Sequence, residues 1–142
     1  MEKLELKETH NTPGVLLDPH QHIIKFWGES RPEDAYEFFS PIKKWLNNYH
    51  SWIASVSSKK NKPTSIQIQC GFNIEYFNST SAKWFKEIIL ELINIKKMNE
   101  KPDFKIDLKI YFMYQEQDED MLEMINEFSK LVDYPILPVI KS

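Results

Sequence analysis

Two stretches of the chain alternate apolar and polar residues with almost no interruption. Residues 65–77 form the first stretch and residues 104–114 form the second. Because neighbouring side chains of a strand point to opposite faces, this alternation predicts two strands with one buried face each. The residues expected on the buried face of the first strand are Ile66, Ile68, Cys70, Phe72, Ile74 and Tyr76.

The segment between these two strands has the period of a helix. From about Ser81 to Met98, apolar residues recur every three or four positions. Trp84, Leu90 and Ile93 widen the apolar arc beyond what one sheet face requires. A strand, a long helix and a second strand predict a parallel crossover connection.

Shorter patterns predict strands before the first helix. Residues 3–9 alternate weakly, which is typical of a short edge strand. Residues 15–17 and 22–27 form two apolar runs on either side of a turn at residues 18–21. Two runs joined by a short turn predict a hairpin, which Gly28 is expected to end.

The first helix is predicted to begin at Ser30. Ser30 and Glu33 have the spacing of a capping box, and Pro32 suits the first turn of a helix. Pro41 is expected to bend or divide the helix, because it removes a ladder hydrogen bond. Residues 55–62 are polar and precede a proline, so we expect an exposed loop there. The expected apolar positions of this helix are Tyr36, Phe39, Ile42, Trp45, Leu46 and Tyr49.

The C-terminal part predicts a third helix and a last strand. Acidic residues 116–120 precede the helix, as the helix dipole favours. Residues 136–140 are expected to form a short strand, which Pro138 confines to the edge of the sheet. The residues of the helix expected to point inward are Met121, Leu122, Ile125, Phe128 and Leu131.

Together these elements predict a single α+β domain spanning residues 1–142. The expected order is β-β-β-α-β-α-β-α, followed by the short last strand. Both central strands are polar on one face, so helices are expected to cover only the other face. The predicted architecture is a mixed sheet of about five strands, with about three helices mainly on one face.

Composition and charge narrow the range of functions. The formal charge of -3 and the pI near 5.8 argue against nucleic acid or a membrane surface as the main partner. No apolar run approaches the roughly 20 residues of a membrane span, and the charged N-terminus lacks a signal-peptide core. Cys70 is the sole cysteine, which excludes an intrachain disulfide and fits a reducing cytoplasm.

The sequence offers little for catalysis. It has no Walker loop and no nucleophile elbow, and its three glycines are too few for a phosphate-cradling loop. His20 and His22 lack a third ligand at a suitable spacing, so no metal site is expected. The acidic residues 116–120 lack the EF-hand pattern and suit a helix start, with contact to a partner's basic patch as the alternative. We therefore expect neither enzyme activity nor a cofactor.

The strongest candidate site is the turn Asn78-Ser79-Thr80-Ser81. It follows a central strand and precedes a helix, a position where ligands usually meet sheets of this kind. A Ser or Thr there can act as a helix N-cap, which by itself explains the residue type. The positive pole of the helix would also stabilise a phosphate carried by a hydroxyl. One hydroxyl would suffice as a cap, and the turn has three. This surplus favours the interpretation as a phosphorylation site without excluding the interpretation as a helix cap.

Several motifs occur in a combination more specific than any one of them. In chain order they are Thr12-Pro13, the box Gly28-Glu29-Ser30-Arg31-Pro32-Glu33 continued by Asp34-Ala35-Tyr36-Glu37-Phe38, Pro41-Ile42 with Trp45-Leu46, Tyr76-Phe77-Asn78-Ser79-Thr80-Ser81 with Lys83, and Asp118-Glu119-Asp120-Met121. Through these motifs the chain resembles, along nearly its full length, the SiaC family of bacterial regulatory phosphoproteins. The family is similar in layout to the STAS domains of anti-sigma-factor antagonists, so a STAS-like domain is implied.

The resemblance implies a non-enzymatic switch protein. In the family, a kinase related to the histidine-kinase ATPase fold phosphorylates a hydroxyl of the turn, and a metal-dependent PP2C-like phosphatase removes the phosphate. The unphosphorylated form binds and activates a diguanylate cyclase, which implies a link to cyclic-di-GMP and biofilm behaviour. Two other functions stay open for this chain: an anti-sigma-factor antagonist, and a small domain that binds an anion or nucleotide through the same turn.

The resemblance also implies which hydroxyl is modified. The family's acceptor directly follows the Asn, which corresponds to Ser79 in this chain. The family pattern has Thr at that position, whereas here Thr80 comes one residue later. We therefore rank Ser79 first, Thr80 second and Ser81 third as phosphorylation sites.

Four neighbouring residues are expected to bind the partner. Asn78 and Lys83 belong to the turn motif itself. Trp84 and Ile93 exceed the apolar stripe that the core requires, so they are candidates for direct contact, with core packing as the alternative.

Overall fold

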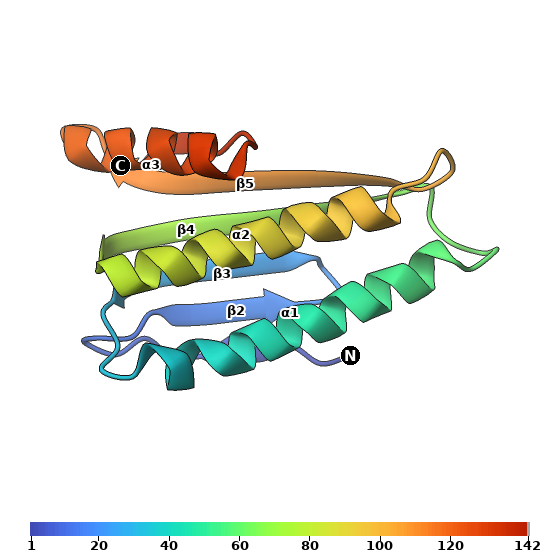
Figure 1. The fold of residues 1–142 in the computed structure, drawn as a ribbon, viewed down its shortest axis with the longest axis horizontal. Coiled ribbons are helices and arrows are strands. Elements are labelled where there is room, and N and C mark those ends of the chain that lie inside the picture. Colours follow the sequence, from blue (N-terminus) through green and yellow to red (C-terminus); the bar gives the residue numbers. More distant parts are fainter. Residues whose placement is uncertain (142) are drawn as a thin grey trace.

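The protein consists of one mixed β-sheet with a layer of helices on one face. The structure is a computed structural model and describes residues 1–141. Within these residues, six strands form a single sheet and three helices lie side by side across it (Figure 1). The strands are β1 (Leu4–Leu6), β2 (Gly14–Asp18), β3 (Ile23–Ser30), β4 (Ser65–Phe77), β5 (Lys105–Gln115) and β6 (Leu137–Lys141), and the helices are α1 (Ala35–Ser57), α2 (Ser79–Asn99) and α3 (Glu119–Val132).

The strands follow one another across the sheet in chain order. β1, β2 and β3 pair antiparallel through short turns, which confirms the predicted hairpin. β3, β4, β5 and β6 pair parallel, and a helix connects each strand to the next. Each of these helices therefore begins at the carboxyl end of a strand, and all of them begin at the same end of the molecule (Figure 1). This is the end that carries the candidate turn.

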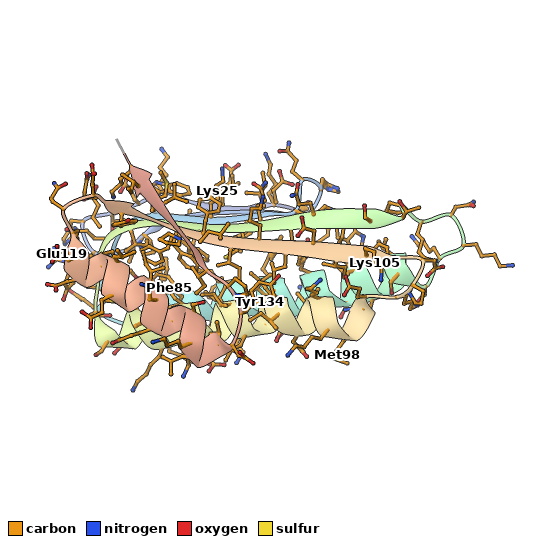
Figure 2. The ribbon with its side chains drawn as sticks, turned by 90° about the horizontal axis from the view of Figure 1, so that it is seen from above. Lys25, Phe85, Met98, Lys105, Glu119 and Tyr134 are labelled. Carbon is orange, nitrogen blue, oxygen red and sulfur yellow. The ribbon has the colours of Figure 1, made fainter. Side chains whose placement is uncertain are left out.

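The core lies between the sheet and the helices. Phe85 of α2 sits at its centre, with ring centroids 5.6 Å from Phe26 of β3 and 5.2 Å from Phe72 of β4. Figure 2 shows Phe85 between the two layers and Lys25 on the opposite, helix-free face. The expected one-sided helical cover is thus confirmed. α2 lies between α1 and α3, which explains why its apolar arc is wider than one sheet face requires.

A one-residue irregularity interrupts the pairing of β3 with β4. Gly28 pairs with Ile74, but Glu29 pairs with Tyr76, so Glu75 is an extra residue on β4. A bulge of this kind reverses the faces of the residues that follow it. Tyr76 is accordingly exposed, contrary to its expected place in the core, and Phe77 is buried instead. Gly28 has a φ of 93° at this point.

The start of α1 differs from the sequence prediction. Ser30 is the last residue of β3, so Gly28 does not end the hairpin and Ser30 is not a helix cap. The N-cap is Asp34, whose side chain accepts a hydrogen bond from the Glu37 N–H at 3.0 Å. Both Ser30 and Asp34 are three residues before a Glu, and the continuation of β3 past Gly28 decides between the two capping boxes.

Other details of the helices differ from the prediction. Pro41 does not divide α1, which continues through it and ends at Ser57, so residues 58–62 of the predicted 55–62 loop lie outside the helix. Tyr36 and Leu131 were expected to point inward, yet they are 73% and 67% exposed. Each is one residue from an end of its helix.

Candidate functional site

The turn after β4 is capped by Asn78. Its side-chain Oδ1 accepts a hydrogen bond from the Ser81 N–H at 2.9 Å, and its backbone is extended. α2 therefore begins at Ser79, two residues earlier than its apolar pattern indicated. Because Asn78 supplies the cap, the hydroxyls of Ser79, Thr80 and Ser81 occupy the first turn of the helix and are not needed to begin it.

The three hydroxyls differ sharply in exposure. Ser79 and Thr80 are exposed to solvent. Ser81 is 0% exposed, and in this conformation no enzyme can reach its hydroxyl. The reason is helical geometry: Ser81 lies one turn before Phe85 on the stripe that faces the sheet.

The Ser81 hydroxyl is held by Ser30. Ser81 Oγ donates to the Ser30 backbone carbonyl at 3.0 Å and accepts a hydrogen bond from Ser30 Oγ at 2.8 Å. The Asn78 N–H donates to the same carbonyl at 3.1 Å. Ser30 is also 0% exposed. The carboxyl end of β3 and the start of α2 are thereby joined side by side.

The start of α2 lacks the negative side chains that the other helix starts carry. α1 has Glu37 in its first turn, and α3 has Glu119 and Asp120, whereas the first turn of α2 contains no acidic residue. The exposed Lys83 lies one helical turn after Ser79. The positive pole of α2 and this ammonium group therefore act on the same exposed hydroxyls.

An aromatic cluster lies near the turn, where α1 and α2 pack side by side (Figure 1). Trp84 is half-buried and stacks on Phe39 of α1, with ring centroids 5.3 Å apart and an interplanar angle of 9°. The exposed Tyr36 ring lies 6.4 Å from Trp84. Behind Trp84, a small groove of about 80 Å³ separates the two helices, with Lys43 and Glu87 among its lining residues. Trp84 is thus both a packing residue and a surface residue.

Ile93 does not share this surface. It is 5% exposed and belongs to the core. Nine residues separate it from Trp84, which corresponds to two and a half helical turns, so the two side chains point to opposite sides of α2. Trp84 contacts α1, and Ile93 therefore lies on the side of α3. Of the four partner-binding candidates, Asn78, Lys83 and Trp84 lie at the surface near the turn, and Ile93 does not.

The other chemistry-bearing residues do not form a second site. Cys70 is buried in the sheet, and burial raises the pKa of its thiol. His22 Nδ1 lies 2.6 Å from the Tyr49 hydroxyl, and burial lowers the pKa of His22. The acidic residues 116–120 are exposed around the start of α3, where Asp118 serves as N-cap. Within residues 1–141, no group of three or more His, Cys, Asp or Glu side chains is placed to hold a metal ion.

Sequence reasoning missed two residues of the site. Ser30 was interpreted as a helix cap, although it lies on the same face of β3 as the buried Ile24 and Phe26. Tyr36 was assigned to the core, although it directly follows the first helical residue. The burial of Ser81 could have been inferred, since it continues the apolar spacing of Phe85 and Ile88 by one turn.

Comparison with known proteins agrees with this fold. Residues 6–139 match the model of the SiaC family regulatory phosphoproteins. An uncharacterized protein of Pseudomonas aeruginosa strain UCBPP-PA14 is 22% identical over 135 residues, which cover 95% of this chain and 94% of that protein. None of the helices described in residues 1–141 is long and apolar enough to cross a membrane.

Two solved structures share the fold over the whole chain. The crystal structure of apo-SiaC from Pseudomonas aeruginosa is 19% identical, covers 100% of both chains and has a TM-score of 0.71. SiaC from the same organism, in a crystal structure with the diguanylate cyclase SiaD that it activates, is 20% identical with a TM-score of 0.70, over 97% of this chain and 99% of that one. The match of the family model over nearly the whole chain shows that this protein belongs to the SiaC family of regulatory phosphoproteins.

Proposed function

We propose that this protein is a non-enzymatic switch whose phosphorylation at Ser79 or Thr80 decides whether it binds an output protein. The observation that carries the proposal is the exposure of these two hydroxyls in the first turn of α2, in a chain that belongs to a family of regulatory phosphoproteins. Ser79 remains the first choice and Thr80 the second. Burial of Ser81 argues against the third choice.

The electrostatics of the turn support this assignment. Phosphorylation adds roughly -1.5 to -2 charges. The first turn of α2 has no acidic side chain to repel that charge, and the helix pole favours it. Lys83 lies four residues after Ser79, the spacing at which an anion followed by Lys stabilises a helix. The phosphorylated turn is therefore a stable state of the protein, as a switch requires.

The partner surface is formed by the exposed side chains around the turn. Thr80 and Trp84 are one helical turn apart and share a side of α2, and Tyr36 of α1 lies next to Trp84. Aromatic residues of this kind often dominate binding energy at interfaces. A phosphate beside them would have to be desolvated on docking. Changing a partner from mostly bound to mostly free takes roughly 5.5 kcal/mol, which repulsion and phosphate desolvation together can supply.

The proposed partners follow from the family. A kinase of the histidine-kinase ATPase type adds the phosphate, and a PP2C-like phosphatase removes it. The Pseudomonas aeruginosa SiaC is described as the activator of the diguanylate cyclase SiaD. We propose a diguanylate cyclase as the output protein here as well, bound and activated by the unphosphorylated form. The chain would act as one domain in the cytoplasm, without a cofactor or catalytic activity of its own.

Intact-mass measurement tests the acceptor. The wild type, Ser79→Ala, Thr80→Ala and the double variant are each incubated with ATP and the kinase. We expect one added phosphate on the wild type and none on the double variant, with the single variants identifying the preferred hydroxyl. Full phosphorylation of the double variant would contradict the proposal. Ser40→Ala on α1 is the control for loss of a hydroxyl outside the turn, and it should behave as the wild type.

Binding measurements test the output. Unphosphorylated protein should bind the cyclase and raise its production of cyclic-di-GMP, and phosphorylated protein should do neither. Equal affinity of both forms by calorimetry would rule out the switch. If a phosphate-bearing metabolite raised the melting temperature of unmodified protein instead, the turn would be an anion-binding site.

A further inference from the structure

Two sequence motifs that lie far apart meet inside the protein. Ser30 ends the Gly-Glu-Ser motif of β3, and Ser81 ends the Asn-Ser-Thr-Ser motif at the start of α2, 51 residues later. The Ser30 hydroxyl donates to the Ser81 hydroxyl, and the Ser81 hydroxyl donates to the Ser30 carbonyl. The Asn78 N–H donates to that same carbonyl. We call the Ser30 and Ser81 side chains, together with the Ser30 carbonyl, the serine clasp.

The clasp is fully buried and internally satisfied. Both serines are 0% exposed, and no buried side-chain N or O atom within residues 1–141 lacks a hydrogen-bond partner. A buried hydroxyl that loses its partner retains the full cost of desolvation, so the Ser30 hydroxyl depends on Ser81 as its acceptor. The arrangement thus ties the two segments more firmly than an exposed hydrogen bond of the same length would.

The clasp lies between the two parts of the proposed partner surface. Ser30 is followed by the segment that leads to α1 and Tyr36, and the next amide, Arg31 N–H, donates to the Asn11 carbonyl at 2.8 Å. On the other side, Ser81 shares the first turn of α2 with Ser79 and Thr80. The position of the exposed hydroxyls relative to α1 is therefore set where the serines meet.

We infer that Ser30 and Ser81 are positioning residues: their buried clasp holds the exposed Ser79–Thr80 pair in a fixed place relative to the start of α1. The role of the clasp in phosphorylation rests on the proposed function. The clasp itself rests only on the contacts above, and the two can be tested separately.

The direction of the hydrogen bonds makes the two alanine variants unequal. Ser81→Ala removes the acceptor of the Ser30 hydroxyl and leaves a buried donor without a partner. Ser30→Ala leaves the Ser81 hydroxyl still donating to the Ser30 backbone carbonyl, which alanine retains. Removing both hydroxyls leaves no unpaired donor, and replacing both partners can be nearly neutral. Ser81→Ala should therefore be the most disruptive variant, and Ser30→Ala added to it should restore part of the loss.

Amide hydrogen exchange measures the clasp directly. The reporters are the Asn78 and Ser81 amides, which donate to the Ser30 carbonyl and to Asn78 Oδ1. Ser81→Ala should accelerate their exchange about tenfold, the factor that corresponds to about 1.4 kcal/mol. The double variant should exchange more slowly than Ser81→Ala. Ser57→Ala is the matched control, because Ser57 is also buried and its hydroxyl bonds within α1 at the far end of that helix.

Two results would overturn the clasp. The first is unchanged exchange at both reporter amides in Ser81→Ala. The second is an effect of Ser57→Ala on these amides as large as that of Ser81→Ala, which would indicate general loosening of the protein. If Ser81→Ala does not fold, Ser30→Ala and the double variant still decide the question. The clasp predicts that each of them accelerates exchange of the reporter amides by less than the roughly tenfold factor expected for Ser81→Ala.

Phosphorylation kinetics then test the positioning role. With the kinase, Ser81→Ala should lower kcat/KM for phosphate transfer about tenfold, and the double variant should recover part of it. Wild-type kinetics in a variant with accelerated exchange would refute the positioning role. Absence of any phosphorylation of the wild type would instead refute the proposed function, while the exchange data would still decide whether the clasp exists.

Discussion

Tyr36 and Trp84 lie with their ring centroids 6.4 Å apart, at the starts of two different helices. Tyr36 is mostly exposed, whereas Trp84 is half-buried against Phe39. The same small surface therefore contains one residue, Tyr36, that contributes little to stability and one, Trp84, that the fold needs for packing. This difference allows partner binding to be separated from stability.

Tyr36→Ala should leave stability almost unchanged and weaken binding. As a surface substitution it should change the free energy of unfolding by less than about 0.5 kcal/mol, while affinity for the proposed cyclase partner should fall about tenfold or more. Trp84→Ala should cost about 1–3 kcal/mol of stability as well, because its stacking on Phe39 is lost. Denaturant unfolding and calorimetry measure the two effects. Wild-type affinity of a folded Tyr36→Ala protein would remove Tyr36 from the surface.

Asn78→Ala should destabilise the start of α2. It removes the acceptor of the Ser81 N–H, and loss of an N-cap typically costs about 1 kcal/mol. Asn78→Asp should retain the stability of the wild type, because a carboxylate caps a helix equally well. Urea unfolding makes the comparison, with Asn47→Ala on the exposed side of α1 as the control. Equal losses in Asn78→Ala and Asn78→Asp would contradict the capping role.

Gly28→Ala should destabilise the protein by about 1–2 kcal/mol. Gly28 has a φ of 93°, which residues with a Cβ rarely adopt, and an added Cβ would lie 2.4 Å from Glu8 Oε2. Combining Gly28→Ala with Glu8→Ala separates the two causes by thermal unfolding. We expect the loss to persist in the double variant. Full recovery there would show that the contact with Glu8 is the cause and that the backbone is not.

Stability should fall as the pH decreases through the range where His22 titrates. Burial lowers the pKa of His22 in the folded protein; the charge of Asp18 opposes this shift and that of His20 adds to it. The unfolded chain, with a His pKa of about 6.5, then takes up the proton first. His22 titration therefore makes no contribution to the free energy of unfolding above about pH 7. As the pH falls below about 6.5 it lowers that free energy, until His22 of the folded protein is also protonated.

His22→Asn tests this origin. Asn tolerates the positive φ of 58° at this position, although the hydrogen bond with Tyr49 is lost. The variant should be less stable at pH 8, but its free energy of unfolding should decrease less between pH 7 and 5 than that of the wild type. His10→Asn, on the exposed N-terminal loop, should retain the wild-type slope. An unchanged slope in His22→Asn would assign the acid sensitivity to other groups.

Much of the fold could be predicted because the central elements have strong periodicity. β4 and β5 alternate over their whole buried length, and the apolar stripe of α2 fixes its face. The errors lie where a local pattern permits two answers. Ser30 and Asp34 both fit a capping box. Asp34 is the cap because β3 continues to Ser30, which the sequence pattern does not indicate. The extra residue at Glu75 leaves no mark in the composition, so Tyr76 and Phe77 exchanged faces.

The site was predicted in outline and not in detail. The position of the turn followed from the junction of β4 with α2, where Asn78 lies, although the hydroxyls belong to the first turn of the helix and not to the loop before it. Chemistry alone cannot rank three adjacent hydroxyls. Their ranking depends on the rotation of the helix, and that rotation buries Ser81 while it exposes Ser79 and Thr80. The contact of Ser81 with Ser30 spans 51 residues and has no local signal.

The extra residue in β4 also works as a spacer that sets the phase of α2. It turns Phe77 inward, and with Phe77 anchored, the chain leaves the sheet in the one orientation that brings the Asn78 side chain over the helix start. If β4 instead continued without the extra residue, so that Glu75 paired with Glu29, Tyr76 would face the core and Phe77 would face outward, and the start of α2 would no longer be aligned with Ser30. The irregular pairing between Ile74 and Phe77 is consequently as much a part of the proposed switch as the hydroxyls themselves.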